Sequence, residues 1–189
     1  MQVMMKDRRI QKTKDAIQSA LAKLLREKSI DKMTVKQLCE VANINKSTFY
    51  LHYRDIYDCA DYLRDTIVDD LIAVFAPYSF ADIIHNFSVV LEDIMKTFDK
   101  NKDIYMPFLK SPSLSYSLCT MKNAIIEKVL EKVDDQDRNH GMDEFMVTFI
   151  ISGMISVLEQ HDFTDLNQQT ISNLADKVQN GFASMPSTR

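Results

Sequence analysis

The sequence has few of the residues that interrupt helices. Among 189 residues there are only 3 glycines and 4 prolines. Their scarcity fits a chain built from long helices, because proline breaks a helix interior and glycine weakens it. No segment alternates apolar and polar residues in the manner of a strand. We therefore predict an all-α protein.

Two further absences limit where the protein works. The most apolar segment, 146–158, is shorter than the roughly 20 residues that span a bilayer, and polar residues interrupt it. The basic N-terminus continues into an amphipathic pattern and not into the apolar run of a signal peptide. The 3 cysteines are odd in number and lack metal-ligand spacing, so reduced thiols and no metal are expected. We expect a cytoplasmic protein.

Catalytic signatures are also missing. The sequence has no glycine-rich phosphate loop, no HExxH and no GxSxG, and its 4 histidines are scattered. A small helical enzyme would need a nucleophile and base at a known spacing, and none is visible. We predict that the protein is not an enzyme and needs no cofactor.

Charge is unevenly divided along the chain, whose formal net charge is −4. Residues 1–56 contain 12 Lys and Arg against 6 Asp and Glu, whereas the remainder contains 11 against 21. The contrast between +6 and −10 is typical of a basic nucleic-acid-binding segment joined to an acidic body. An ordinary solvated surface would produce a similar imbalance, so charge alone leaves both interpretations open.

Residues 34–53 contain two short predicted helices separated by a tight turn. Thr34 and Gln37 have the spacing of a capping box, in which each side chain accepts the other's backbone N–H. The first helix ends at Asn43, a residue type that tolerates the left-handed conformation common at helix C-termini. Asn45 is a favourable N-cap for a second helix over 46–53. The arrangement is that of a helix-turn-helix.

The second of these helices has an inner and an outer face. Phe49 and Tyr53, four residues apart, are predicted to point inward. Groove-reading helices carry their DNA contacts near their start, and hydroxyl, amide and basic groups suit base edges and phosphates. We predict DNA contacts from Thr34, Asn45, Lys46, Ser47, Thr48, Tyr50 and His52. The alternative is a capped helical corner with a solvated face.

Together with the preceding helix, the segment TVKQLCEVANINKSTFYLHYRDIYD resembles the DNA-binding domain of TetR/AcrR-type bacterial transcriptional regulators. That family has Ala-Gly-Val-Ser at the turn, where this chain has Ala-Asn-Ile-Asn at 42–45. The family's Tyr-x-x-Phe matches Tyr50 and Tyr53. Its phosphate-binding Lys aligns with Ile56, so Arg54 is the candidate replacement. The resemblance implies a dimeric regulator, in most cases a repressor, whose operator binding is modulated by a ligand.

The domain prediction follows the same pattern. Residues 1–54 are expected to form a three-helix DNA-binding domain, with a basic arm before a helix at 8–27, and residues 55–189 a helical ligand-binding and dimerisation domain. Body helices are predicted at 55–75, 82–100, 103–109, 112–133, 144–160 and 165–182.

The helix at 144–160 is apolar on nearly every side, which predicts burial from two directions. The resemblance implies that it and the last helix form a four-helix bundle with a second copy, on a palindromic operator. The predicted interface residues are Phe149, Gly153, Val157, Leu174 and Val178. A core helix within a monomer is the alternative.

An effector pocket is predicted among the middle helices of the body. Methionine and aromatic side chains form adaptable apolar walls there, with a few polar tips. The candidate residues are His85, Met95, Tyr105, Tyr116 and Cys119, and the expected ligand is a neutral, partly apolar small molecule or one recognised by hydroxyls. Ordinary core packing would explain the same residues, and a helical protein-protein interaction module, or a regulator with a protein effector, is the alternative function.

Overall fold

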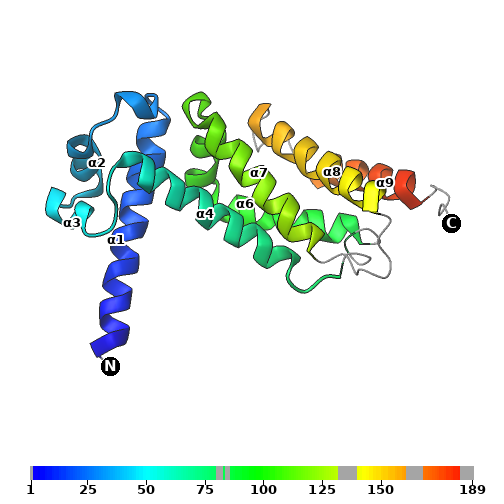
Figure 1. Ribbon diagram of the computed structural model, residues 1–189, viewed down its shortest axis with the longest axis horizontal. Helices are drawn as coiled ribbons and strands as arrows, with labels where there is room; N and C mark the ends of the chain where they lie inside the picture. The colour runs from blue at the N-terminus through cyan, green and yellow to red at the C-terminus, as the bar shows by residue number, and fades with distance from the viewer. Residues whose placement is uncertain (1, 80–82, 84–85, 132–139, 161–167, 184–189) are drawn as a thin grey trace. The chain divides into compact units, whose positions relative to one another are not determined.

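The computed structural model describes residues 2–79, 83, 86–131, 140–160 and 168–183 (Figure 1). These residues form helices and no strand, which confirms the predicted all-α fold. The α-helices are α1 (Gln2–Leu25), α2 (Val35–Ala42), α3 (Lys46–Tyr50), α4 (Ile56–Phe75), α6 (Phe87–Leu109), α7 (Ser115–Leu130), α8 (His140–Gln160) and α9 (Gln168–Ala183), with short 3-10 helices η1 (Ile30–Lys32) and η2 (Pro112–Leu114). None of the described helices is both long and apolar enough to cross a membrane.

Several helix boundaries differ from those predicted. Helix α1 already begins at Gln2, so the predicted basic arm is mostly helical, and α8 begins at His140, four residues before the helix predicted at 144–160. The helices predicted at 82–100 and 103–109 are joined in α6. Phe98, Tyr105 and Phe108 are all buried at spacings of seven and three, so one helical face continues beneath the polar residues between them.

The chain groups into two compact units. The first comprises Met1–Ile67 and Asp103–Cys119. Within it α2 packs against α1 (Figure 1), and the core includes the fully buried Leu21, Leu38 and Leu63. Polar contacts join the two chain segments of this unit. Arg26 Nη2 lies 2.9 Å from Asp103 Oδ1, and the backbone N–H of Ile30 donates to Ser113 Oγ at 3.3 Å.

The second unit comprises Val68–Lys102 and Thr120–Arg189. Its core includes Phe87 and Leu91 of α6, which pack against Ile150 and Met154 of α8 and Val178 of α9. A small apolar cavity of about 30 Å³ lies in the same core, lined by residues of α4, α6, α7 and α8. The unit is thus a helical bundle with a closely packed interior.

Candidate nucleic-acid interface

The first helix of the helix-turn-helix begins as predicted. The backbone N–H of Gln37 donates to Thr34 Oγ1 at 3.2 Å, and the backbone N–H of Thr34 donates to Gln37 Oε1 at 3.1 Å. Two amides that a helix start leaves without a partner are therefore satisfied by side chains. The box fixes where α2 begins and leaves Thr34 exposed.

The turn between α2 and α3 depends on Asn43. It adopts φ 54° and ψ 48°, the left-handed conformation that its sequence position predicts, and it is the one such non-glycine residue in the described chain. The following backbone N–H, of Ile44, donates to the Cys39 carbonyl oxygen at 3.0 Å and closes the helix end. The chain can then redirect within three residues and start α3 at Lys46.

Helix α3 is held in place by aromatic side chains. Phe49 and Tyr53 are buried, as predicted, with ring centroids 5.6 Å apart. Tyr62 of α4 lies edge-on to Tyr53 at 5.6 Å. Because α3 has only five residues, its orientation depends on these contacts more than on its own hydrogen bonds.

The outer face of α3 presents most of the predicted contact residues. Lys46, Ser47 and Tyr50 are exposed, as is Asn45 just before the helix. Thr48 and His52 are half-buried. Asn45 occupies the N-cap position, yet its side chain makes no capping hydrogen bond. The surface therefore offers one ammonium, hydroxyls, an amide and a phenol within one short stretch.

Arg54 is exposed but is already paired within the chain. Its backbone N–H donates to Asp58 Oδ2 at 2.9 Å, and its Nη2 lies 3.0 Å from Asp58 Oδ1. The backbone hydrogen bond, with the guanidinium bond second, lowers the pKa of Asp58 below its usual range. Ile56, at the position of the family's Lys, is buried. A phosphate contact from Arg54 would have to compete with Asp58.

The structure draws attention to one residue that periodicity did not single out. Leu51 follows α3 directly, and 81% of its surface is exposed. An isolated exposed leucine is common, but this one lies beside Tyr50 on the outer face of the motif. Apolar groups at such positions contact thymine methyl groups in DNA complexes. A search for exposed apolar residues next to the predicted polar contacts would have found it.

A second unpredicted feature braces the start of α4. The Tyr57 hydroxyl donates to Asp31 Oδ1 at 2.6 Å, and Ser29 Oγ donates to Asp31 Oδ2 at 2.9 Å. The Tyr57 hydrogen bond, followed by that of Ser29, lowers the pKa of Asp31. The contact joins η1 to α4 on the same unit as α3.

The five predicted effector residues do not gather in one place that the structure describes. His85 lies outside the described residues. Met95 is half-buried in the second unit, whereas Tyr105, Tyr116 and Cys119 belong to the first. Tyr105 is buried, and 83% of the Tyr116 surface is exposed. The predicted pocket remains a prediction.

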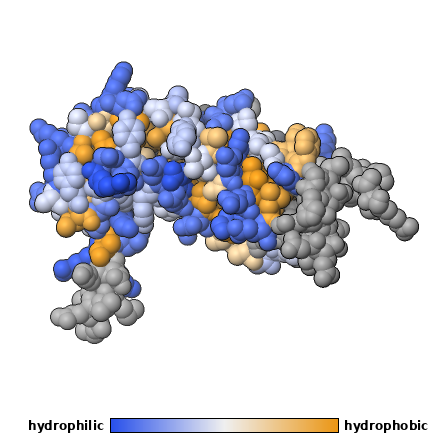
Figure 2. Space-filling model, viewed as in Figure 1, coloured by the Kyte–Doolittle hydropathy of each residue, from blue (hydrophilic) through white to orange (hydrophobic). Residues whose placement is uncertain are grey.

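Helix α8 is apolar on two opposite faces. Val147 and Ile151 are buried in the unit, whereas 71% of the Phe145 surface and 63% of the Phe149 surface are exposed. Gly153 is exposed on that outer face, and in the described part of the chain no heavy atom beyond its own stretch of helix lies within 4 Å of the position a Cβ would take. Hydrophobic residues also gather at the surface where Figure 1 places α7 and α8 (Figure 2). Of the other predicted interface residues, Val157 and Val178 are half-buried, and the Leu174 side chain lies outside the described part.

Comparison with known proteins finds similar solved structures among transcriptional regulators. No protein-family model and no curated protein matches the chain. Among solved structures it is similar to a TetR transcriptional regulator from Streptococcus agalactiae 2603V, with 26% identity and a TM-score of 0.62 over 95% of this chain and 98% of that one. It is also similar to the dihydroxyacetone kinase operon activator DhaS, with 15% identity and a TM-score of 0.55 over 91% and 94% of the two chains. At 15% identity the second likeness shows the fold alone.

Proposed function

We propose that this protein is a DNA-binding transcriptional regulator of the TetR type. The observation that carries the proposal is the helix-turn-helix itself: α3 is fixed by buried aromatic residues and directs Lys46, Ser47 and Tyr50 outward. The similarity to a solved TetR regulator over nearly the whole chain supports the same function for the body as well. In this proposal residues 1–54 bind DNA, and residues 55–189 form the ligand-binding and dimerisation domain.

The residues of the outer face divide into two roles. Lys46, and Arg54 when released from Asp58, would neutralise phosphates and supply affinity that depends little on sequence. Tyr50, Ser47 and Leu51 would meet base edges, with Leu51 against a thymine methyl. The half-buried Thr48 and His52, with Thr34 and Asn45, would complete the contacts to the backbone of the duplex.

The regulator would act as a homodimer through α8 and α9. Two exposed phenylalanines one helical turn apart form an apolar face that a second copy would cover. A two-fold dimer places its recognition helices about 34 Å apart, or a multiple of that distance, so the operator would be an inverted repeat. We propose that the protein acts in the bacterial cytoplasm and represses transcription, as the family resemblance implies.

Ligand control of such a dimer requires the ligand to bind one arrangement of the two DNA-binding domains more tightly than another. The coupling is typically about 1–3 kcal/mol, or 5- to 150-fold in operator affinity. We propose a small-molecule effector bound in the body. No enzymatic activity is proposed.

A salt titration with duplex DNA tests the proposed function. The affinity for random duplex should fall steeply as salt rises, since binding releases counterions. Lys46→Ala should reduce the salt slope by about one unit, and Tyr50→Ala should cost about 1–3 kcal/mol on the selected operator. Lys128→Ala is the charge-matched control, because Lys128 lies on α7 and pairs with Glu131 at 3.0 Å.

The titration also separates a regulator from a protein-interaction module. A module whose helix-turn-helix contacts another protein would show weak duplex binding even at low salt. A folded Lys46 and Tyr50 double variant that keeps the full affinity for an operator selected from a random pool would refute the proposed interface.

A further inference from the structure

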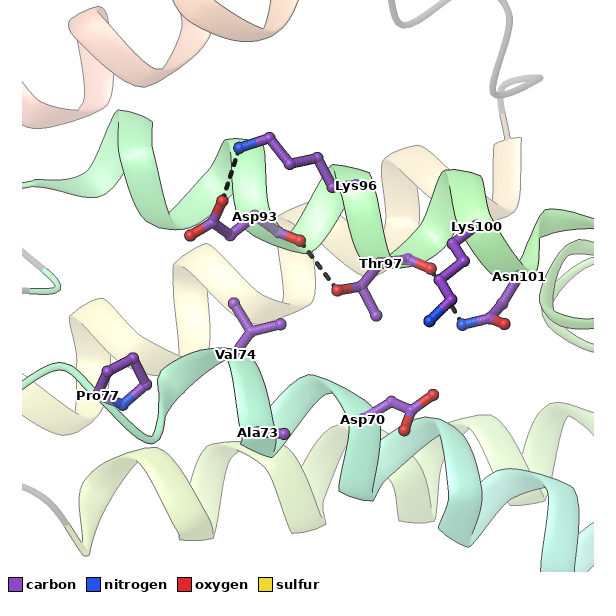
Figure 3. A pocket seen from close by; sticks show the side chains of 9 residues that line it. All are labelled: Asp70, Ala73, Val74, Pro77, Asp93, Lys96, Thr97, Lys100 and Asn101. Carbon is purple, nitrogen blue, oxygen red and sulfur yellow. Dashed lines mark hydrogen bonds and ion pairs between the residues drawn. The ribbon is translucent and has the colours of Figure 1, made fainter.

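A groove of about 500 Å³ runs between α4 and α6 in the second unit (Figure 3). One wall comes from the end of α4 and the turn after it, with Ala73, Val74 and Pro77. The other wall comes from α6, where Lys96, Thr97, Lys100 and Asn101 recur at helical spacing. Its volume lies in the range of sites that bind small molecules.

The two walls are held by the packing beneath them. Phe75 of α4 and Val90 and Ile94 of α6 are buried and line the same small apolar cavity. At one end the Tyr78 hydroxyl donates to Asp93 Oδ2 at 3.2 Å and joins the turn after α4 to α6. The groove exists because the α4 wall carries short side chains where larger ones would fill the space.

Most of the charge in the groove is already compensated. Lys96 Nζ lies 2.8 Å from Asp93 Oδ1, and the other Asp93 oxygen accepts the Tyr78 hydrogen bond. The Lys96 contact, the largest cause, lowers the pKa of Asp93, so that carboxylate stays charged and paired. Asp70, on the α4 wall, also has interactions within the molecule. These groups leave little charge for a ligand.

Lys100 differs from Lys96 in the contacts of its ammonium group. Within the described part of the chain its ammonium makes no hydrogen bond or ion pair. Figure 3 shows Lys100, Thr97 and Asn101 reaching from α6 towards α4, whereas Lys96 turns to Asp93. Asn101 donates one amide hydrogen to the Thr97 carbonyl oxygen at 3.2 Å, which leaves its second amide hydrogen available.

We propose that this groove binds a small organic monoanion with an aliphatic body. The anionic group lies at Lys100 and the amide of Asn101, and the aliphatic part lies along Ala73, Val74 and Pro77. Two carboxylates and two ammonium groups line the groove, and Asp70 lies across from Lys100 (Figure 3), so a polyphosphate is disfavoured and a single negative charge fits. This ligand differs from the neutral compound expected from the sequence.

The inference names a ligand class for the proposed regulator, and in that sense it rests on the proposed function. The site itself rests on the groove alone. Binding is therefore measured first with the full chain and no DNA.

The test is calorimetric titration with octanoate, which has a carboxylate and an aliphatic chain. One octanoate should bind per chain. The affinity for 1-octanol, which lacks the charge, should be lower by a factor of about ten or more. Lys100→Met should weaken octanoate about ten-fold while keeping the stem of the side chain. Lys102→Met is the matched control and should change nothing, because Lys102 pairs with Asp99 at 3.0 Å and does not line the groove.

A blocking variant tests the position of the aliphatic part. Ala73 is exposed on the groove wall, so Ala73→Phe should fill the space, leave the thermal melt unchanged and abolish octanoate binding. Equal binding of inorganic phosphate would overturn the aliphatic part of the proposal. Absence of octanoate binding at millimolar concentration, or binding insensitive to Lys100→Met and Ala73→Phe, would overturn the site.

The effect of octanoate on DNA binding is measured in a separate experiment. Octanoate should change the duplex affinity of the wild type and not that of Lys100→Met. Octanoate binding by a protein that binds no duplex would support the proposed ligand site and refute the proposed function as a regulator. Duplex binding without octanoate binding would support the proposed function and refute the ligand site.

Discussion

Replacing Phe149 with Asp is expected to convert a dimer into a folded monomer. Phe145 and Phe149 form the exposed apolar face of α8, and in a two-fold interface each substitution occurs twice. Loss of a buried aromatic at the centre of an interface costs about 2 kcal/mol or more, which is at least 30-fold in the dissociation constant. Sedimentation at micromolar concentration measures the change. Operator affinity should fall with it, because the two DNA-binding domains no longer bind as one unit.

Gly153→Leu gives the same test without adding a charge. Gly153 is exposed, and among the described residues no heavy atom outside its own stretch of helix backbone lies within 4 Å of an added Cβ, so we expect a monomer to accommodate leucine. Leucine is also the better helix former by nearly 1 kcal/mol, and α8 itself should not weaken. Dimerisation should nevertheless fail, since the added side chain separates the paired helices. Val89→Asp, at an exposed apolar residue of α6, is the control that should stay dimeric. A wild type that sediments as a monomer would contradict the interface.

The aromatic cluster behind α3 should respond to two substitutions with opposite signs. Phe49→Ala removes a side chain with no exposed surface and should cost about 3–5 kcal/mol of unfolding free energy. Tyr53→Phe should instead stabilise by about 1 kcal/mol or more, because the buried Tyr53 hydroxyl has no hydrogen-bond partner among the described residues. The same burial raises the pKa of Tyr53. Urea denaturation measures both changes.

The pair also distinguishes packing from polarity. The Tyr-x-x-Phe motif of the TetR/AcrR-type regulators has phenylalanine at the position of Tyr53, so Tyr53→Phe should keep DNA binding intact. A destabilised Tyr53→Phe variant would show that the hydroxyl has a partner that the described contacts lack, such as a bound water.

Local features of the motif were predictable from the sequence, and the structure bears out their geometry. The capping box of Thr34 and Gln37 and the left-handed Asn43 involve residues within a few positions of one another, so their chemistry decides the outcome. The end of α3 was not predicted. The helix stops at Tyr50, and the buried Tyr53 beyond it packs edge-on against Tyr62, which lies outside the motif.

Features that depend on distant residues were beyond sequence reasoning. The polar residues at 99–103 suggested a break, yet Phe98 and Tyr105 keep one buried face and α6 continues. The groove joins Ala73 to Lys100 across elements that no spacing relates. Arg54 looked like a free cation, and the partner Asp58 is one turn away, where either residue type would also be ordinary surface.

The exposed position of Leu51 also makes it a suitable site for a fluorescent reporter of DNA binding. The chain contains no tryptophan, so Leu51→Trp would be its sole indole fluorophore. With 81% of the native side chain exposed, the indole should emit at the long wavelength of a hydrated ring. Docking of α3 into a major groove would remove that water and shift or quench the emission. A fluorimeter could then time the arrival and departure of the protein on DNA without any attached dye.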